Sequence, residues 1–379
     1  MTNLENLISK LCSDGVLYSL IADVTFYEQP GKYIVKNTNY NDAFHTPVLT
    51  AGQSFVLGRT NETAGIYEAS KDSPVIIFDD FTGAFKWVDF SFKVKSSALK
   101  ILTSDEKKIC LRYLYHVMGS LGFTSDEHKR LWIATYSQLR IPLPPLPVQQ
   151  EIVRILDSFT ELTAELTAEL TARRKQYEYY RDELLITSID KTLGFVPLEN
   201  CCEILDSKRK PVTKASREAG KYPYYGANGI QDYVSNYIFD GTFVLVGEDG
   251  SVITPTGNPV VTWAEGKIWV NNHAHIIRET KEFSLRFLYY YLQTVNVTKL
   301  IHGNIPKLTG SDFRAIPIPA VSKTVQEEIV QTLNRFDTLC NDLTSGLPAE
   351  IAARQKQYEY YRDKLLTFKE LEGENAENY

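Results

Sequence analysis

The amino-acid sequence predicts an α+β fold in which two mixed α/β globular segments alternate with two long helices, related by an internal pseudo-two-fold repeat. Three observations lead to this fold class. The chain has 379 residues, more than one domain usually contains. Two segments, 172–185 and 353–366, are identical at twelve of fourteen positions. Each half of the chain also places its strand-like segments before a helical one.

The composition excludes several classes of protein. Hydrophobic residues make up 43% of the chain and charged residues 23%, and the mean hydropathy is -0.23, as in ordinary globular domains. No run reaches eighteen apolar residues, and Glu5 and Asp14 interrupt the apolar positions near the N-terminus. We therefore expect no membrane span, no secretory signal and a cytoplasmic location. The net charge of -6 argues at first sight against a nucleic-acid-binding protein, although local patches can still bind DNA.

The cysteines indicate neither a disulfide framework nor a metal site. Their number, five, is odd, and they form no Cys-x-x-Cys pair and no Cys/His cluster with zinc spacing. We expect free, buried thiols in a reducing compartment. The five are Cys12, Cys110, Cys201, Cys202 and Cys340.

The internal repeat extends beyond the fourteen-residue match. Residues 148–159 resemble residues 325–336, and each of these segments follows an Ile-Pro-x-Pro run. A period of about 180 residues lies far beyond the range of solenoid repeats. The chain is therefore predicted to be a duplicated module, each copy consisting of a globular segment followed by a helix.

Both repeated regions are predicted to be long amphipathic helices. Apolar residues recur at three- and four-residue steps through residues 148–186, and the prolines at 142–147 fix an extended approach to the helix. A continuous helix of this length spans about 58 Å. The second copy, 325–366, contains Ser-Gly-Leu-Pro at 345–348. We expect a break there, with a glycine C-cap and with Pro348 in the first turn of a new helix.

The two helical copies differ in length by one four-residue unit. Twelve residues separate Phe159 from Ala172, and sixteen separate Phe336 from Ala353. The shorter linker is itself a tandem repeat of Thr-Ala-Glu-Leu, at 163–166 and 167–170. One such unit lengthens a helix by about 6 Å and turns it by about 40°. The segment can therefore set a distance.

The two globular segments show the same order of predicted elements. The first is predicted to form strands at 46–51, 54–58, 74–79 and 87–94, followed by a helix at 105–119. The second is predicted to form strands at 242–247, 259–263 and 275–278, followed by a helix at 284–297. We therefore expect the segments to share a fold despite little sequence identity.

No motif for catalysis is present. The sequence lacks a phosphate-binding loop, a nucleophile elbow, a zinc-protease motif and a dinucleotide fingerprint. Asp249, Glu265 and Lys267 could hold Mg²⁺ as in a nuclease if they converged, but residues 265–267 more simply predict a hairpin turn. His273 and His275 could offer two metal ligands, but no third is evident, so a polar or DNA-facing edge is favoured.

Basic, aromatic and amide side chains in loops are the candidates for nucleic-acid binding, because cations contact phosphates while planar and hydrogen-bonding groups contact bases. In the first segment they are Arg59, Lys86, Trp87, Lys93, Lys95, His128, Lys129 and Arg130. In the second segment they are Lys208, Arg209, Lys210, Tyr224, Tyr225, Asn228, Asn272, His273 and Lys307. Any one of them could equally be ordinary solvated surface.

These features resemble the specificity subunit of a type I restriction-modification enzyme. The resemblance lies in the module order, the Ile-Pro-x-Pro run into a long helix, the duplicated Lys-Gln-Tyr-Glu-Tyr-Tyr-Arg-Asp and the Thr-Ala-Glu-Leu repeats. Tyr-Pro-Tyr-Tyr-Gly-Ala-Asn-Gly at 222–229 and Asn-Asn-His-Ala-His at 271–275 add to it. The resemblance covers nearly the whole chain.

The resemblance implies an architecture and a DNA target. Target-recognition domains would occupy residues 1–147 and 191–324, spacer helices would occupy 148–190 and 325–368, and an acidic tail would occupy 369–379. The helices would pack antiparallel as a coiled-coil spacer. Each domain would bind one half of a bipartite, asymmetric site in double-stranded DNA in which adenines are methylated.

The resemblance also implies partners. The helices would dock modification (methyltransferase) subunits, usually two, which bring S-adenosylmethionine, and restriction subunits that use ATP and Mg²⁺ can join. The chain itself would bind no cofactor or metal and would not be an enzyme. The expected docking residues are those duplicated in the helices, although the tyrosines among them could instead complete the coiled-coil core. They are Tyr177, Tyr180, Arg181, Tyr358, Tyr361 and Arg362.

Two alternatives come from other functional classes. A stand-alone nuclease would use Asp249, Glu265 and Lys267 and would cut DNA with Mg²⁺ alone. A protein-only coiled-coil adaptor would bind no DNA.

Overall fold

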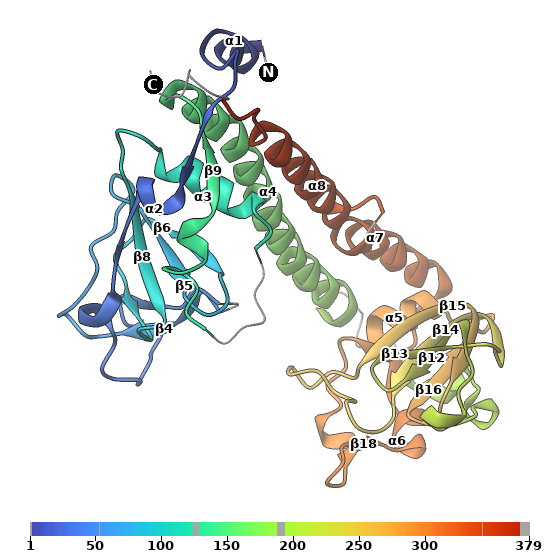
Figure 1. Ribbon diagram of the computed structural model, residues 1–379. Helices are drawn as coiled ribbons and strands as arrows, with labels where there is room; N and C mark the ends of the chain where they lie inside the picture. The colour runs from blue at the N-terminus through green and yellow to red at the C-terminus, as the bar shows by residue number, and fades with distance from the viewer. Residues whose placement is uncertain (1, 53, 124–128, 188–193, 343, 372–379) are drawn as a thin grey trace. The chain divides into compact units, whose positions relative to one another are not determined.

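The computed structural model describes residues 2–52, 54–123, 129–187, 194–342 and 344–371 (Figure 1). The chain divides into two compact units. Unit 1 contains Met1–Glu165 and Ile351–Tyr379, and unit 2 contains Leu166–Glu350. Each unit thus combines one globular segment with helical pieces from both copies of the repeat.

The globular part of unit 1 is built on mainly antiparallel strands and one main helix, α3. A four-stranded sheet has the order β2-β8-β5-β6, a three-stranded sheet has the order β4-β3-β7, and β1 pairs with β9. The elements are α1 (Thr2–Leu11), β1 (Leu17–Leu20), α2 (Ile21–Val24), β2 (Thr25–Glu28), β3 (Thr46–Leu49), β4 (Val56–Thr60), β5 (Val75–Asp79), β6 (Phe85–Val88), β7 (Lys93–Val94), β8 (Leu99–Ser104), α3 (Leu111–Ser120) and β9 (Arg140–Leu143).

The globular part of unit 2 is built on a six-stranded sheet of order β11-β16-β14-β15-β12-β13, with α5 beside β14 and β15 (Figure 1). Two short ribbons, β10-β19 and β17-β18, complete it. The elements are β10 (Phe195–Pro197), β11 (Glu203–Ile204), β12 (Ala219–Gly226), β13 (Gly229–Val234), β14 (Phe239–Gly247), β15 (Val261–Val270), β16 (Ala274–Arg278), α5 (Leu285–Leu292), β17 (Ile301–His302), β18 (Lys307–Leu308), α6 (Gly310–Arg314) and β19 (Pro317–Pro319).

The two globular parts share one topology, as the sequence predicted. The order β2-β8-β5-β6 in unit 1 matches β11-β16-β14-β15 in unit 2, and every neighbouring pair is antiparallel in both. The hairpin partners also match, because β3 pairs parallel with β7 as β12 pairs parallel with β15. The α+β fold class with an internal repeat is therefore confirmed.

Two details of the predicted strands are wrong. The expected strand 87–94 is interrupted, and its residues belong to β6 and β7. The turn expected at 265–267 is absent, because β15 runs through these residues and pairs with β14. Gly241 and Gly266 face each other in this pair with positive φ values of 144° and 80°, conformations that glycine adopts without steric cost. The polar residues of 265–267 therefore mark a glycine-bent strand.

The two repeated helical segments agree closely with the prediction, whereas the helices predicted at 105–119 and 284–297 are shorter, Leu111–Ser120 and Leu285–Leu292. Helix α4 spans Leu146–Asp182 and continues into a π-helical turn, Glu183–Thr187. The second copy breaks as expected into α7 (Lys323–Asn341) and α8 (Leu347–Leu365), with Pro348 in the first turn of α8. The expected glycine C-cap is not observed: Asp342 caps α7, and Gly346 instead approaches the carbonyl oxygens at the end of α7.

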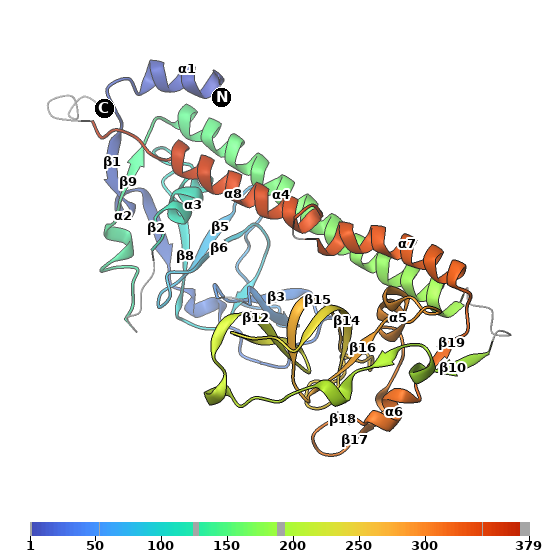
Figure 2. The same ribbon diagram turned by 90° about the vertical axis from the view of Figure 1, so that its right-hand side faces the viewer.

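The helices exchange partners between the copies of the repeat. In unit 1 the first part of α4 packs antiparallel against α8 (Figure 2), and there the rings of Phe159 and Tyr361 stack with centroids 5.3 Å apart. In unit 2 the last part of α4 packs antiparallel against α7 (Figure 2), and there the rings of Tyr180 and Phe336 stack with centroids 5.5 Å apart. Phe336 is the repeat counterpart of Phe159, and Tyr361 is the counterpart of Tyr180. The same Phe–Tyr contact therefore occurs twice, and in each case the phenylalanine comes from one copy of the repeat and the tyrosine from the other.

Within unit 1, the N-terminal segment at Val16 is hydrogen-bonded to residues 369–371 near the C-terminus. The N–H of Val16 donates to the carbonyl of Lys369 (2.9 Å), and the N–H of Leu371 donates to the carbonyl of Val16 (2.9 Å). Arg140 forms an ion pair with Glu370 at 2.5 Å. The first residues of the predicted acidic tail thus belong to the folded unit, and residues 372–379 lie outside the described residues.

All five cysteines are free, and four of them are buried. Burial raises the pKa of the Cys201 and Cys202 thiols to about 12, which keeps both thiols protonated. Among the described residues, none of the helices has the length and apolar character that crossing a membrane requires.

Candidate nucleic-acid interface

A buried glutamine joins the globular part of unit 1 to α4. Gln149 is fully buried, and its Nε2 donates to the carbonyls of Lys108 (2.9 Å) and Pro144 (2.8 Å). Its Oε1 accepts a hydrogen bond from the N–H of Cys110 (2.8 Å), the residue directly before α3. One side chain therefore holds together the start of α3 and the proline-rich approach to α4.

The same arrangement recurs in unit 2. Gln326 of α7 is fully buried, its Nε2 donates to the carbonyls of Glu282 (3.2 Å) and Val321 (3.0 Å), and its Oε1 accepts from the N–H of Ser284 (2.8 Å). Ser284 directly precedes α5, as Cys110 precedes α3. The duplication thus reproduces the joint between domain and helix bond for bond.

An arginine on α3 forms a second joint in unit 1. The Nε of Arg112 donates to Asp157 of α4 at 2.8 Å, and its guanidinium lies 4.7 Å from the ring of Trp87 and 4.9 Å from that of Tyr115. Such stacking contributes about 1 kcal/mol per partner. Trp87 is half-buried with Arg112 stacked on its ring, and it stays a candidate for DNA contact.

Unit 2 repeats this joint with different chemistry. Arg286 of α5 lies 4.6 Å from the ring of Trp263 and 4.9 Å from that of Tyr289, and it donates to Asn334 (3.0 Å) and Asp337 (2.6 Å) of α7. Asn334 occupies the repeat position of Asp157. The stacking of the arginine on two aromatic rings is retained, while its acidic partner is Asp337, about one helical turn after the position that corresponds to Asp157.

Asp157 carries a shifted acidity. Burial by itself raises the pKa of its carboxyl, but hydrogen bonds from His116 (2.9 Å) and Arg112 and the charge of Arg112 outweigh this, so the pKa lies below its usual range. The folded-state pKa is depressed, so this group stabilises unit 1 above about pH 4, and the stabilisation is lost as the pH falls through the folded value.

The predicted docking residues divide into core and surface. Tyr177 is only 8% exposed and belongs to the core of unit 2, so the alternative core role fits it better. Tyr358 bonds to His116 at 3.0 Å, and Tyr180 and Tyr361 stack as described above. The guanidinium groups of Arg181 and Arg362 lie over Tyr177 and Tyr358 and pair with Asp182 and Asp363, with side-chain exposures of 18% and 19%.

A pair of exposed tyrosines was missed. Tyr179 is 65% exposed and Tyr360 is 61% exposed, and they occupy equivalent positions of the repeat on α4 and α8. Each packs edge-on against its neighbour, Tyr180 or Tyr361, at 5.6 and 5.3 Å. The signal was in the sequence, because Tyr-Glu-Tyr-Tyr contains three tyrosines and a helix cannot bury all of them on one face.

In unit 1 the candidate DNA-binding residues lie both inside and outside the domain. Lys93 is 1% exposed, and its ammonium group donates to the carbonyls of Ala64 (2.7 Å) and Gly65 (2.9 Å) and pairs with Glu62 (3.1 Å). Lys93 is therefore a core cation, and the prediction that it contacts DNA is corrected.

The remaining candidates of unit 1 reach the surface to different extents. Arg59 is exposed on β4 and donates to the carbonyl of His45 (2.9 Å), and Lys95 is exposed near the ring of Tyr40. Lys86 on β6 is partly buried, whereas Lys129 and Arg130 are exposed, and His128 lies outside the described residues. The remaining candidates of unit 1 among the described residues are thus Arg59, Lys86, Trp87, Lys95, Lys129 and Arg130.

In unit 2 the two tyrosines singled out from 222–229 are interior. Tyr224 is 1% exposed, its hydroxyl donates to the carbonyl of Val212 (3.2 Å), and the guanidinium of Arg217 lies 4.1 Å from its ring. Tyr225 is 7% exposed. Neither presents its ring to DNA, which corrects the expectation, because alternate residues of a strand face opposite sides and both sides of β12 are partly covered.

The other candidates of unit 2 gather at neighbouring loops. Lys208, Lys210, Asn228 and Asn272 are exposed. The N–H of Lys210 donates to the carbonyl of Val270 at 3.2 Å, so the loop that carries both lysines adjoins the end of β15, two residues before Asn272. Asn228 lies in the turn between β12 and β13, and Tyr225 of β12 pairs with the same Val270. These side chains form what we call the polar edge, defined as Lys208, Lys210, Asn228 and Asn272.

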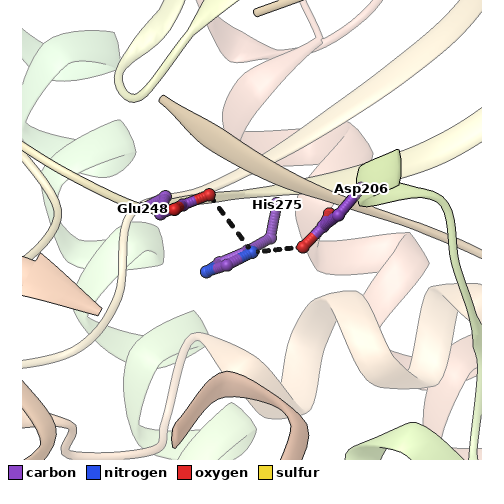
Figure 3. Close-up of side chains that lie close together, drawn as sticks. All are labelled: Asp206, Glu248 and His275. Atoms are coloured by element: carbon purple, nitrogen blue, oxygen red, sulfur yellow. Dashed lines mark hydrogen bonds and ion pairs between the residues drawn. The ribbon is translucent and has the colours of Figure 1, made fainter. Parts of the chain in front are cut away.

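A charged cluster, formed by Asp206, Glu248 and His275, includes a residue only two positions from Lys208 of the polar edge (Figure 3). Figure 3 shows His275 between Asp206 and Glu248, with Nδ1 2.6 Å from Asp206 and 3.6 Å from Glu248. Arg209, expected to contact DNA, is buried against this cluster and donates to Glu248 (2.6 Å) and to the carbonyl of Ala274 (2.7 Å). Its side chain is only 12% exposed, so Arg209 is corrected to an internal cation.

His273 and Lys307 lie at the rim of this cluster. His273 is 47% exposed at its side chain and pairs with Asp249. Lys307 is 46% exposed and lies 3.4 Å from Glu248. Both remain candidates for DNA contact.

The residues of the nuclease alternative do not converge. Glu265 lies opposite Thr242 and Lys267 opposite Asp240 in the pairing of β14 with β15. Asp249 follows the other end of β14, seven residues beyond Thr242, or about 23 Å along an extended strand. Glu265 instead accepts a hydrogen bond from the indole of Trp263 (2.6 Å). The structure does not support this alternative.

Comparison with known proteins assigns the class. The family model for the type I restriction modification DNA specificity domain matches residues 19–173 and 191–353. The chain therefore belongs to this family and contains its DNA specificity domain twice.

Individual relatives agree in sequence and in fold. The chain is 39% identical to a type I restriction enzyme specificity subunit from Escherichia coli, over 97% of each chain. Its fold is similar to the crystal structure of a type I restriction-modification S subunit from M. genitalium, with a TM-score of 0.61, 16% identity and coverage of 93% of this chain and 96% of that one. A second solved structure, from work on complex assembly of the type I R-M system, matches with a TM-score of 0.56 and 15% sequence identity, and the match covers 93% of this chain and 97% of that chain. A protein-only adaptor is not supported.

Proposed function

We propose that this chain is the DNA-recognition subunit of a type I restriction-modification complex. Each globular part binds one half of a bipartite, asymmetric site in double-stranded DNA, and the helices set the spacing between the halves. The observation that carries this proposal is the duplication itself, in which topology, glutamine joint and arginine joint all recur. Two similar DNA-binding domains on one chain fit a target read in two parts.

The partners follow from the same proposal. Two methyltransferase subunits dock on the helical segments and bring S-adenosylmethionine for adenine methylation, and restriction subunits that require ATP and Mg²⁺ can join. The chain contributes recognition and no catalytic group. The complex works in the cytoplasm, where the host DNA is found.

A mobility-shift assay tests DNA recognition. The full chain with its methyltransferase subunits is expected to retard a duplex that carries its methylation site, with an affinity that falls steeply as salt rises. Replacing both lysines of the polar edge, Lys208→Ala with Lys210→Ala, removes about two phosphate contacts and should lower the salt slope by about 2. Lys281→Ala with Lys299→Ala, two exposed lysines of the same unit, serves as the matched control. Binding that is equal for all duplexes, or absent, would overturn the proposal.

Partner docking gives a separate prediction. Because Tyr179 and Tyr360 are exposed on equivalent faces of the repeat, each is expected to anchor one methyltransferase subunit. Tyr179→Ala or Tyr360→Ala should weaken one of two binding steps by about 30-fold, as for an aromatic anchor in an interface. Native mass spectrometry would then show a complex with one methyltransferase subunit in place of two. Tyr27→Ala, a tyrosine 46% exposed on β2, controls for loss of surface area. Loss of neither subunit would remove these tyrosines from the interface.

A further inference from the structure

Among the described residues, the polar groups that face the ring nitrogens of a buried histidine in unit 2 are all hydrogen-bond acceptors. His275 is 1% exposed, its ring stacks on Phe313 at 4.2 Å, and its Nε2 lies 3.0 Å from the carbonyl oxygen of Leu308. Its Nδ1 faces the carboxylates of Asp206 and Glu248 (Figure 3). A carbonyl oxygen can only accept, so Nε2 carries a proton.

The other ring nitrogen must also share a proton. A lone pair on Nδ1 facing a carboxylate oxygen at 2.6 Å would be repulsive, so one proton lies between His275 and Asp206. Asp206 also accepts a hydrogen bond from the N–H of Ile276 (2.9 Å) and lies 3.6 Å from the guanidinium of Arg209, and both contacts favour the ionised carboxylate. With a proton on Nε2 and another between Nδ1 and Asp206, the contacts around the ring are those of an imidazolium paired with a carboxylate.

A metal ion bound by these side chains would be the alternative to a proton between His275 and Asp206. Asp206, Glu248 and His275 could each offer one ligand atom, and these atoms lie within 4.8 Å of one another. Ligands about 2.1 Å from a tetrahedral zinc ion stand about 3.4 Å apart, however, and the Nδ1 to Asp206 separation is only 2.6 Å. Arg209 and Lys307 already approach Glu248 at 2.6 and 3.4 Å. The cluster is balanced by its own cations.

The cluster joins four chain segments that adjoin the polar edge. Asp206 and Arg209 flank Lys208, and Glu248 follows β14. His275 lies three residues after Asn272, and its Nε2 donates to the carbonyl of Leu308, the last residue of β18. Backbone bonds reinforce the same junction, because the N–H of Glu248 donates to the carbonyl of His273 (2.8 Å) and that of Leu308 to the carbonyl of Glu248 (2.8 Å).

We propose that His275, as a buried imidazolium, is the positioning residue of the second DNA-binding domain and fixes the loops that present the polar edge to DNA. This inference rests on the proposed function, because it concerns how that domain meets its half-site. His275 touches no DNA itself. It acts by holding Asp206, and with it the Lys208 and Lys210 loop, against β16 and β18.

Substitution of the histidine tests the positioning role. In the complex of the full chain with its methyltransferase subunits, His275→Gln is expected to weaken binding of the full site at least about tenfold, since one charged hydrogen bond is lost and a buried carboxylate is left unpaired. The loss should appear as tolerance of base changes in the half-site of unit 2, while discrimination at the other half-site stays unchanged. His302→Gln, an exposed histidine of the same domain with 57% side-chain exposure, is the matched control.

A double variant separates positioning from general loss of folding. Asp206→Asn with His275→Gln removes the buried charge together with its partner, so it should recover part of the affinity that His275→Gln alone loses. Equal loss of discrimination at both half-sites, or a double variant no better than the single one, would overturn the positioning role. Failure of the wild-type complex to bind any specific duplex would overturn the proposed function instead.

A measurement on the unaltered chain does not depend on how the variants fold. With ¹⁵N-labelled histidine, the resonances absent from His275→Gln, or from His275→Phe if the glutamine variant is unstable, identify His275. Both ring nitrogens are expected to show directly bonded protons, and added Zn²⁺ or Mn²⁺ should leave them unchanged. A neutral ring, or metal bound in stoichiometric amount to the purified chain, would refute the imidazolium.

Discussion

Replacing either buried glutamine should destabilise one unit and leave the other intact. Gln149→Leu keeps the size of the side chain but leaves the N–H of Cys110 and the carbonyls of Lys108 and Pro144 unpaired inside the protein. Each unpaired buried group costs about 1–3 kcal/mol, so we expect the free energy of unfolding of unit 1 to fall by about 4 kcal/mol. Gln326→Leu should do the same to unit 2.

Hydrogen exchange followed by mass spectrometry measures this effect unit by unit. Amide protection in α3 should fall in Gln149→Leu, and protection in α5 should fall in Gln326→Leu. Gln150→Leu supplies the control, because Gln150 is exposed on the same helix. The joints would not be the stabilising feature described here if Gln149→Leu and Gln150→Leu exchanged alike.

The tandem Thr-Ala-Glu-Leu segment is expected to set the spacing of the DNA half-sites. The division between the units falls at Glu165 and Leu166, within this segment, and α4 is continuous through it. A third unit inserted after Leu170 adds about 6 Å of helix, so the recognised gap should grow by about one to two base pairs. Neither half-sequence should change, because the polar edge and the loops of unit 1 are untouched.

Methylation-site sequencing of cells that carry the altered complex gives the new gap directly. Affinity for the original spacing should fall at least about 100-fold, since two domains that cannot engage together lose their effective concentration. Thr167→Ala, an exposed change without added length, is the control. An unchanged gap would show that the helix does not determine the spacing.

Much of the fold was predictable because the sequence identity between the two copies of the repeat lies mainly in the helical segments. Twelve identical positions of fourteen fixed two helical segments, and Pro348 marked the break between α7 and α8. The order of the strands in the two sheets was not predictable, because the residue pattern of a strand reflects which side is buried and does not identify the strands that pair with it. Leu-Arg-Tyr-Leu-Tyr at 111–115 and Leu-Arg-Phe-Leu-Tyr at 285–289 would have disclosed the arginine joint, but this match is short.

The candidate site was predicted less well than the fold. A lysine in sequence is a surface residue by default, yet Lys93 is held in the core by two carbonyls and a carboxylate that come from residues 62–65. Arg209 lies between two exposed lysines in the sequence and still points inward, because its guanidinium donates to Glu248 and to the carbonyl of Ala274, which come from distant parts of the chain. Only tertiary proximity separates such internal cations from those that can reach DNA.

The interchanged stacking of Phe159 on Tyr361 and of Phe336 on Tyr180 has an evolutionary corollary. A gene cut in half would encode a polypeptide whose aromatic ring lacks its mate, and a sister molecule could supply that mate by the same geometry. The ancestral state before gene fusion would then have been a symmetric homodimer. In such a homodimer the two recognition surfaces would be identical and the target palindromic, whereas two copies within one chain can carry different surfaces and read an asymmetric target.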